Sequence, residues 1–364
     1  AVLAAADPLA ALQRLARAWR RELGARTAGV TGSTGKTSTK DILAALLAPH
    51  VAAVASPANF NTEIGLPLAI LGAPPGTEAL VLEMAMRGRE QIAELTAIAE
   101  PDVGVIVNVG PVHLELMGSL EAIAAAKAEL IRDMPPGGTA VIPAGERLLE
   151  AHLRDDVDVV TFGEGGDVRL VEASDDGRVA IEARGERIEL QLSYTQAHNR
   201  LNTLAAVAAA RALGVWPAGR VEVPFSAMRG ERIDLPNGVA VVDDCYNANP
   251  MSMRAALDEL AVTGTGRRVA VLGDMLELGE RERDFHREVG AYAAQRGVDL
   301  LVTVGPLAAA MLDAYDGEGH AVADAGEAAA LLPELVEPGD TVLVKASRGV
   351  GLEVVASALG EAAG

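Results

Sequence analysis

One segment constrains the fold more than any other: Thr31-Gly32-Ser33-Thr34-Gly35-Lys36-Thr37 stands between an apolar run, 27–31, and a helical pattern, 37–47. Glycines let the backbone approach a ligand closely, so that several N–H groups can point at phosphate oxygens. The N-terminus of the following helix adds a favourable dipole. Lys36 would reach the β- and γ-phosphates, and the Thr37 hydroxyl would bind Mg²⁺. The alternative is an ordinary glycine-rich turn between a strand and a helix.

The rest of the chain predicts α/β architecture. Apolar runs at 79–83 and 103–107 are each followed by a helical pattern, which is typical of a mostly parallel sheet. Short alternating strands over 157–192 predict a small antiparallel patch. A helix is expected over 199–213 and a linker, rich in proline and glycine, over 217–238. A second, Rossmann-like α/β domain follows, with strands at 240–243, 268–272, 300–304 and 341–345.

Composition excludes several classes of protein. The 364 residues include 31 Lys and Arg against 51 Asp and Glu, a net charge of -20, which argues against nucleic acid as a partner. The acidity is otherwise that of a soluble or halophilic surface. One cysteine, Cys245, excludes an intramolecular disulfide and fits a cytoplasmic location. No apolar run is long enough for a membrane span. The second domain lacks a G-x-G-x-x-G turn, so a dinucleotide is not expected.

Polar residues follow two of the predicted strands. Glu83 ends the run 79–83, at the sheet edge where α/β proteins bind ligands. A carboxylate there suits Mg²⁺, although a solvated glutamate at a strand end is the alternative. After 103–107 comes Asn108-Val109-Gly110-Pro111-Val112-His113, and Lys127 lies in an alanine-rich helical segment beyond it. By spacing alone, Lys127 is an exposed helical lysine.

These motifs together resemble the Mur ligase family. The phosphate loop has the shorter form Thr-Gly-x-x-Gly-Lys-Thr, because Val30 stands where the common pattern has glycine. His198-Asn199-Arg200-Leu201-Asn202 resembles the family's H-N-x-x-N, and Gly230-Glu231-Arg232-Ile233-Asp234 resembles its γ-phosphate segment. Asp243-Asp244-Cys245-Tyr246-Asn247-Ala248-Asn249-Pro250 is similar to a sequence of the members that add D-alanyl-D-alanine. The segments 59–67, 84–88 and 272–279 resemble the same members.

The resemblance implies roles for named residues. Lys36, His113, Lys127 and Arg232 would be catalytic, and two Mg²⁺ ions would be held by Thr37, Glu83, His113 and a carbamylated Lys127. ATP would be bound by the set Gly32, Ser33, Thr34, Gly35, Lys36, Thr37, Asn202, Arg232 and Asp244. The other substrates would be bound by the set Asn59, Asn61, Thr62, Arg87, Tyr246, Asn247, Asn249, Lys345, Ser347 and Arg348.

The implied reaction is an ADP-forming amide ligation. ATP would phosphorylate a carboxylate of a UDP-N-acetylmuramoyl-tripeptide, and the amine of D-alanyl-D-alanine would attack the acyl phosphate. The implied domains are a P-loop ATPase domain, 24–229, and a Rossmann-like domain, 230–364. Residues 1–23 would be a helix that leads from an absent UDP-binding domain. The protein is expected to act as a monomer.

Rival interpretations remain open at this stage. The chain could be another ligase of the superfamily with a different acceptor, an ATP-binding remnant, or, with least support, a metabolite kinase. Cys245 is expected to be a small buried residue rather than a nucleophile. His286 and His320 are expected at the surface, and Gly273-Asp274 could be a simple strand-end turn. Ala346 replaces the glycine of the family's K-G-S-R and is expected to stiffen that loop.

Overall fold

The computed structural model describes residues 4–226 and 228–363, which form two compact units. Unit 1 comprises residues 4–110 and 117–226, and unit 2 comprises residues 111–116 and 228–363. The short segment 111–116 therefore belongs with unit 2, although the chain on both sides of it belongs to unit 1.

Unit 1 is built on a sheet with the strand order β10-β9-β8-β7-β6-β5-β4-β1-β3-β2. The strands from β6 to β2 pair in parallel, whereas β7, β8 and β9 pair antiparallel. The strands are β1 (Arg26–Thr31), β2 (Ala53–Ala55), β3 (Ala79–Glu83), β4 (Val103–Ile106), β5 (Thr139–Pro143), β6 (Asp158–Phe162), β7 (Val168–Ala173), β8 (Arg178–Ala183), β9 (Glu186–Leu192) and β10 (Gly219–Val221).

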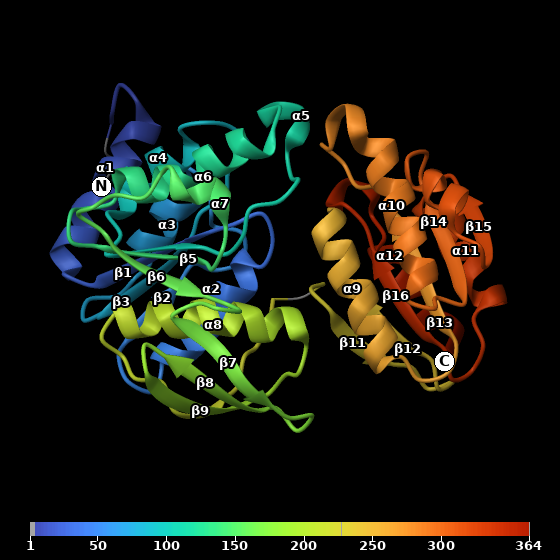
Figure 1. The fold of residues 1–364 in the computed structure, drawn as a ribbon. Coiled ribbons are helices and arrows are strands. Elements are labelled where there is room, and N and C mark those ends of the chain that lie inside the picture. Colours follow the sequence, from blue (N-terminus) through green and yellow to red (C-terminus); the bar gives the residue numbers. More distant parts are fainter. Residues whose placement is uncertain (1–3, 227, 364) are drawn as a thin grey trace. The chain divides into compact units, whose positions relative to one another are not determined.

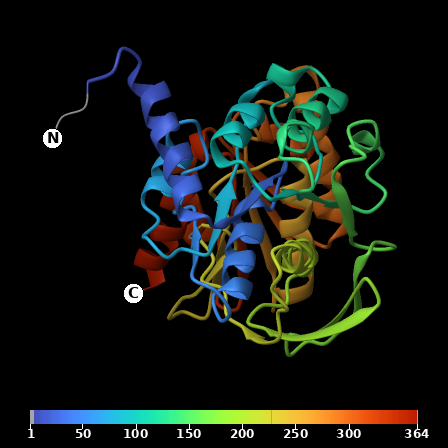
Figure 2. The ribbon, with the colours of Figure 1, turned by 90° about the vertical axis from the view of Figure 1, so that its left-hand side faces the viewer.

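Helices cover both faces of this sheet. The long helices α2 (Lys36–Leu47) and α8 (Ala197–Ala212) pack side by side on one face, and α3 (Gly65–Leu71), α4 (Gln91–Ala99) and α6 (Leu120–Asp133) cover the other (Figures 1 and 2). Helix α1 (Pro8–Leu23) packs against α3 and α4. A further short helix of unit 1 is α7 (Arg147–Glu150), whereas residues 114–116 of the short helix α5 (Leu114–Met117) belong to unit 2. Consecutive buried alanines, 205–206 and 208–210, let α8 pack closely on the sheet, so the core needs few aromatic side chains.

Unit 2 is a second α/β structure with the strand order β11-β12-β16-β13-β14-β15. Only β11 runs antiparallel to its neighbour. Its strands are β11 (Glu231–Asp234), β12 (Ala240–Asp243), β13 (Arg268–Gly273), β14 (Leu300–Val304), β15 (Glu318–Val322) and β16 (Thr341–Lys345). Its helices are α9 (Pro250–Thr263), η1 (Gly279–Arg281), α10 (Glu282–Gln295), η2 (Ala308–Ala314), α11 (Ala325–Leu335), η3 (Arg348–Val350) and α12 (Glu353–Ala363).

The predicted α/β architecture with a small antiparallel patch is confirmed, with two local corrections. The patch begins at β7 rather than at residue 157, because β6 pairs in parallel with β5. The expected linker 217–238 contains the short strands β10 and β11. Both are sheet-edge strands of three or four residues, too short to leave an alternating pattern among prolines and glycines.

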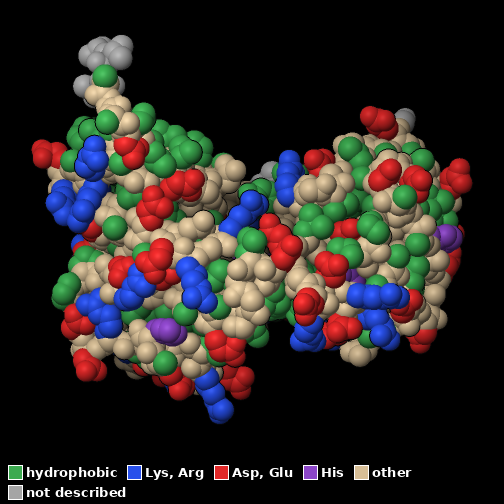
Figure 3. Space-filling model, turned by 90° about the horizontal axis from the view of Figure 1, so that it is seen from above, with side chains coloured by type: hydrophobic (Ala, Val, Ile, Leu, Met, Phe, Trp, Pro, Cys, Tyr) green, Lys and Arg blue, Asp and Glu red, His purple; other side chains and the backbone are tan. Residues whose placement is uncertain are grey.

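The surface is charged but mixed. On the face seen in Figure 3, basic side chains are interspersed with acidic ones on each unit, rather than gathered into the basic face that nucleic acid would need. Among the described helices, none has both the length and the apolar character required to cross a bilayer.

Candidate functional site

The phosphate loop leaves β1 at the carboxyl edge of the unit 1 sheet and enters α2. Gly35 has a φ of +74°, and a Cβ built on it would lie 2.7 Å from Asn202 Oδ1. Asn202, on α8, is 5% exposed. Only glycine satisfies both the backbone conformation and this close approach. The structure thus brings together two of the residues expected to bind nucleotide, Gly35 and Asn202.

Asn108 holds the loop in shape. Its Oδ1 accepts hydrogen bonds from the backbone N–H groups of Ser33, at 3.0 Å, and Thr34, at 2.9 Å, and its Nδ2 donates to Thr34 Oγ1 at 3.0 Å. The Ser33 side chain is itself bonded to the backbone of Gly110. The sequence motifs alone indicate no role for Asn108. The signal was its position just beyond β4, which ends at Ile106 and pairs with β1.

Lys36 points back over the loop. Its Nζ donates to the carbonyl oxygen of Gly32 at 2.8 Å. A lysine in this arrangement covers the space that the loop encloses, where phosphate oxygens would replace the carbonyl as acceptors. The loop therefore has the backbone shape and the cation that a polyphosphate needs.

The side chains expected to hold the first metal ion meet beside the loop. Thr37 Oγ1 donates to Glu83 Oε2 at 2.7 Å, and Asn61 Nδ2 donates to Glu83 Oε1 at 2.8 Å. Glu83 is 2% exposed, so it is not the solvated strand-end residue of the alternative interpretation. Adjacent ligands of an octahedral Mg²⁺ lie about 3 Å apart, so the Thr37 and Glu83 oxygens fit such an ion.

Lys127 is buried, which overturns its interpretation from spacing alone as an exposed helical lysine. It is 2% exposed on α6, and burial lowers its pKa well below the ordinary value; the nearby charge of Lys36 lowers this pKa further. Its neighbours at helical spacing, Ile123, Ala124, Leu130 and Ile131, are fully buried. A buried amine whose charged form is disfavoured therefore lies within electrostatic range of the phosphate-loop lysine.

His113 lies in the segment that belongs to unit 2. Its Nδ1 shares a hydrogen bond with Glu277 Oε2, and the backbone N–H of Glu115 donates to the Glu277 carbonyl oxygen at 3.3 Å. The structure thus brings Thr37, Glu83 and Lys127 into unit 1 and places His113 with unit 2. Glu277 lies within the segment 272–279, whose resemblance to the family gave this glutamate no role of its own.

The loop after β2 supports the metal candidates. Asn61 reaches Glu83 by its side chain, and its carbonyl oxygen accepts from the N–H of Ala85 at 2.9 Å. The Asn59 carbonyl accepts from the Asn61 N–H at 2.8 Å, and Thr62 Oγ1 accepts from Gly65 N at 3.4 Å. Arg87, on the next loop, is exposed. Asn61 is therefore tied to the phosphate site, whereas Asn59 and Thr62 shape the loop.

Unit 2 gathers most of its candidates at the carboxyl ends of its parallel strands. Lys345 ends β16 and donates to Asp244, which follows β12. Arg229 lies over the ring of Tyr246 at 4.0 Å, and Asn247 is exposed. Arg232 lies apart, on the edge strand β11, where it pairs with Asp234 at 3.0 Å.

Three further candidates of this edge have partners within the protein. Asn249 is the N-cap of α9 in a reciprocal capping box with Ser252. Ser347 Oγ accepts from Leu276 N at 3.0 Å. Arg348 is exposed, and its Nη1 donates to Met228 Sδ at 3.2 Å.

Further expectations for unit 2 have mixed outcomes. Cys245 is 1% exposed and burial raises its pKa to about 12, so it is the small buried residue expected and not a nucleophile. His286 was expected at the surface, which is wrong: it is fully buried, and its Nε2 accepts from Met275 N at 2.9 Å. His320 is intermediate in exposure. Ala346 does not have a positive φ. It packs against Gly273, and a Cβ added to Gly273 would lie only 2.7 Å from the Cβ of Ala346.

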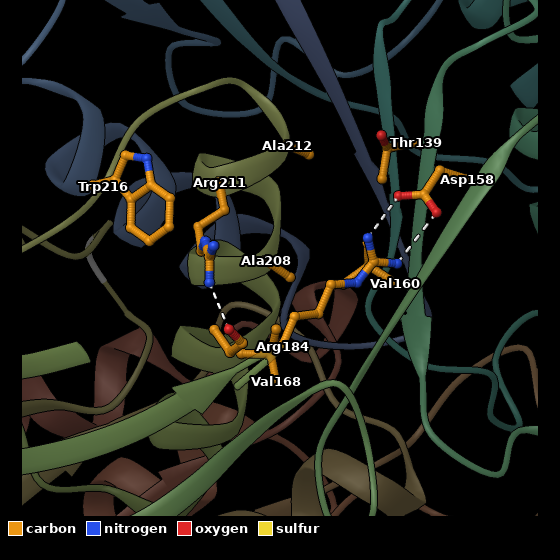
Figure 4. A pocket seen from close by; sticks show the side chains of 10 residues that line it. Thr139, Asp158, Val160, Val168, Arg184, Ala208, Arg211, Ala212 and Trp216 are labelled. Carbon is orange, nitrogen blue, oxygen red and sulfur yellow. Dashed lines mark hydrogen bonds and ion pairs between the residues drawn. The ribbon is translucent and has the colours of Figure 1, made fainter. Parts of the chain in front are cut away.

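A pocket of about 250 Å³ in unit 1 is lined by none of the residues of the phosphate loop. Figure 4 shows the side chains that line it. It adjoins the first residues of β5 and β6 and the last turn of α8, at the sheet edge opposite to the loop. Its arginines already have protein partners: Arg184 pairs with Asp158, and Arg211 bonds to the Ala183 carbonyl and lies over Trp216. This pocket is not the candidate site.

Comparison with known proteins gives the class. Residues 30–210 match the Mur ligase middle domain, and residues 228–348 match the family described as Mur ligase, glutamate ligase domain. The chain belongs to the Mur ligase family.

Within this family, the chain is similar to ligases of one particular kind. The chain is 37% identical to a UDP-N-acetylmuramoyl-tripeptide–D-alanyl-D-alanine ligase of Bacillus subtilis, over 98% of this chain and 80% of the relative. It is 40% identical to a ligase of the same description from Synechocystis, over 97% and 78%. The structure of MurF from Thermotoga maritima in complex with ADP superposes with a TM-score of 0.87 at 33% identity, covering 99% of this chain and 85% of that one. MurF from Acinetobacter baumannii gives a TM-score of 0.89 at 29% identity, covering 99% and 82%.

Proposed function

We propose that this chain is an ATP-dependent ligase that joins D-alanyl-D-alanine to UDP-N-acetylmuramoyl-tripeptide in the synthesis of peptidoglycan precursors. The observation that carries the proposal is a phosphate loop whose Thr37 hydroxyl bonds to the buried Glu83 carboxylate, in a chain similar to such ligases over nearly its whole length. ATP use is supported by the ADP complex of the Thermotoga relative. The same family supports a cytoplasmic location, where ATP is available.

The reaction requires negatively charged groups to approach one another. A substrate carboxylate oxygen attacks the γ-phosphorus of ATP, the bond to the bridging oxygen breaks, and ADP leaves. The amine of D-alanyl-D-alanine then attacks the acyl phosphate carbon, loses a proton and expels phosphate. Lys36 and Arg232 would offset phosphate charge, which is the main requirement of such a transfer. The substrate supplies the nucleophile, so no side chain has to form a covalent intermediate.

Two Mg²⁺ ions are part of the proposal. Bound next to ATP, these ions would polarise the phosphate oxygens and neutralise their charge. Thr37 and Glu83 would hold one ion, because their oxygens are buried and lie at the separation of adjacent ligands. Lys127 would contribute to the second ion, and the family resemblance also assigns His113 as a metal ligand. The hydrogen bond between Glu277 and His113 Nδ1 would orient the imidazole ring.

Carbamylation of Lys127 is the finer part of this proposal. The reaction with CO₂ requires a neutral amine, and the burial of Lys127 lowers its pKa and so favours that form. A carbamate would also place a negative charge near Lys36. ¹³C-labelled bicarbonate tests this step: we expect a carbamate carbon signal in the wild type that Lys127→Met removes. An identical spectrum for the two proteins would refute it.

The remaining roles follow the family resemblance. Residues 24–229 would bind ATP and residues 230–364 would close over it, with residues 1–23 leading into the first of these domains. The loop, Asn202, Arg232 and Asp244 would contact nucleotide. The other substrates would be contacted from the set Asn59, Asn61, Thr62, Arg87, Tyr246, Asn247, Asn249, Ser347 and Arg348; Lys345 belongs to this set by sequence. The enzyme would act as a monomer, which light scattering tests.

The test of the function is amide formation. Purified protein is incubated with ATP, Mg²⁺, bicarbonate, UDP-N-acetylmuramoyl-tripeptide and D-alanyl-D-alanine, each omitted in turn. We expect phosphate release and a new amide product only in the complete mixture. Nucleotide binding without product in any mixture would favour the ATP-binding remnant, and product with a different acceptor would favour another ligase of the superfamily.

A further inference from the structure

Lys345 occupies a central place in unit 2. It is the last residue of β16, which pairs in parallel with β12 on one side and with β13 on the other. Its side chain is 3% exposed. At the carboxyl edge of a parallel sheet, where ligands bind, a lysine so deeply buried is unusual and calls for a partner.

The ammonium group of Lys345 is already saturated by protein acceptors. It donates to Asp244 Oδ2 at 2.6 Å, to the Asp244 carbonyl oxygen at 3.3 Å and to the Asn247 carbonyl oxygen at 3.0 Å. An ammonium has three N–H donors, so these three acceptors use them all. A substrate carboxylate would have to displace one of these bonds and enter a site that is closed to solvent. Direct substrate contact, the role implied by family resemblance, therefore does not fit this geometry.

The acceptors all lie in one loop, 244–249. The loop is fixed at both ends: Asp244 N donates to the Val344 carbonyl at 2.9 Å, and Asn249 caps α9. Between these ends, two side chains at the end of β16 and just beyond it hold the loop backbone. The Lys345 ammonium donates to the Asn247 carbonyl, and Ser347 Oγ donates to the Ala248 carbonyl at 3.4 Å.

The loop presents the groups expected to meet ligands. The Asp244 side chain is 23% exposed, and only its Oδ2 is bonded to Lys345. In the described chain no group donates to Oδ1, so this oxygen remains an acceptor for a ligand. Asn247 is exposed, and the Tyr246 ring lies beneath Arg229. The candidates for nucleotide binding and for binding of the other substrates thus lie on one loop whose backbone a buried cation helps to hold.

We propose that Lys345 is a positioning residue: it orients the Asp244 carboxylate and the backbone at Asn247, so that one loop serves two substrates at once. The proposal rests on the proposed function for the identity of those substrates. It differs from direct contact in one measurable way. A direct contact affects the substrate it touches, whereas a displaced loop affects every substrate that the loop binds.

Steady-state kinetics of Lys345→Met test this difference. Met retains most of the buried volume but provides no donor. We expect KM for ATP and KM for D-alanyl-D-alanine both to rise by roughly 10- to 100-fold, the range of a strong local coupling. A rise confined to one substrate would establish direct contact and overturn the proposal, as would unchanged constants.

Two controls separate positioning from general damage. Arg267→Met removes the cation of a second pair in unit 2, which bonds to the buried Asp340 at 3.0 Å just before the first residues of β13 and β16. We expect it to lower stability and leave both KM values near those of the wild type. The double variant Lys345→Met/Asp244→Asn should be little worse than Lys345→Met alone, because the two residues act as one unit. Fully additive losses would contradict this.

Hydrogen exchange provides a test that does not depend on ligase activity. Asp244→Asn removes the charged acceptor and leaves Lys345 in place, so it serves even if Lys345→Met does not fold. We expect the backbone amides at 245–248 to exchange faster than in the wild type. Exchange near Arg267, where β13 and β16 begin, should be unchanged. Unchanged exchange in the loop would overturn the proposal. If the wild type formed no amide product, the proposed function would fail while this readout would still decide the role of Lys345.

Discussion

The sharpest prediction concerns Glu83→Gln. Glu83 is 2% exposed and accepts from Thr37 and Asn61. A glutamine can keep both contacts, because its oxygen accepts from Asn61 while its amide donates to a rotated Thr37 hydroxyl. We therefore expect the free energy of unfolding to change by no more than about 1 kcal/mol. The negative charge is lost, however, and with it the ligand that Mg²⁺ prefers.

The expected loss is in metal-dependent steps. Removing one charge-stabilising group from a transfer site typically costs on the order of 100- to 1,000-fold in rate, and we expect phosphate release to fall by that factor. Nucleotide binding is measured with and without Mg²⁺. In the wild type Mg²⁺ should tighten binding; in Glu83→Gln the affinity should be the same in both conditions.

Glu129→Gln is the matched control. Glu129 is also a buried carboxylate, 4% exposed, and it accepts from the backbone N–H groups of Glu90 and Ala93 at the start of α4. Glutamine can accept only one of these bonds well, so we expect a loss of about 1–3 kcal/mol in stability and an unchanged Mg²⁺ effect on nucleotide affinity. If Glu83→Gln kept the Mg²⁺ effect, or if both variants lost it, the role assigned to Glu83 would be wrong.

Three further predictions can be tested independently. Gly35→Ala should weaken nucleotide binding at least tenfold, because a left-handed φ costs about 1–2 kcal/mol and the methyl group would meet Asn202; Gly76→Ala, with a φ of +88° and open space around it, should leave nucleotide affinity unchanged. Lys127→Met should retain or raise stability, since it removes a buried ionisable group, but should lower the ligase rate about 100-fold; a rate equal to that of the wild type would exclude Lys127 from the site. Burial lowers the pKa of His286, so its contribution to stability is fully present above the unfolded pKa, about 6.5, and is lost as pH falls toward the folded pKa. Urea titrations at pH 7.5 and 5.5 should show a decrease that is smaller in His286→Asn; equal decreases would contradict the assignment.

The phosphate loop could be predicted from sequence because local chemistry determines it. A glycine with positive φ, a lysine and a threonine at the start of a helix have few other uses, and the chain on either side defines the strand and the helix. Glu83 could be placed at the same edge, since parallel strands end on one side of a sheet. Its bond to Thr37 could not, because that depends on which strand lies beside which.

The sequence around Lys127 contains a signal of burial that the prediction of an exposed lysine did not use. Ile123, Ala124, Leu130 and Ile131 lie three or four positions away and form one apolar helix face that includes Lys127. This apolar face indicates burial, whereas the interpretation of Lys127 as exposed did not take it into account. Reading the lysine by its residue type alone gave the wrong exposure.

The remaining differences between the predictions from sequence and the structure arise from tertiary contacts. His286 looks like a surface residue in the sequence, but it lies on the buried face of α10 and accepts the Met275 N–H. Asn249 resembles a ligand-binding residue, and its position before Pro250 also identifies an N-cap. The saturation of Lys345 by the 244–249 loop requires two strands far apart in the sequence to be neighbours, which no local pattern reports.

The central claim is that this chain forms an amide bond at the expense of ATP. The most direct measurement is mass spectrometry of the product after incubation with ATP, Mg²⁺, UDP-N-acetylmuramoyl-tripeptide and D-alanyl-D-alanine, together with quantified ADP. We predict a UDP-N-acetylmuramoyl-pentapeptide and one ADP for each amide formed. ATP hydrolysis without this product, or the same rate of ADP formation when D-alanyl-D-alanine is omitted, would contradict the claim.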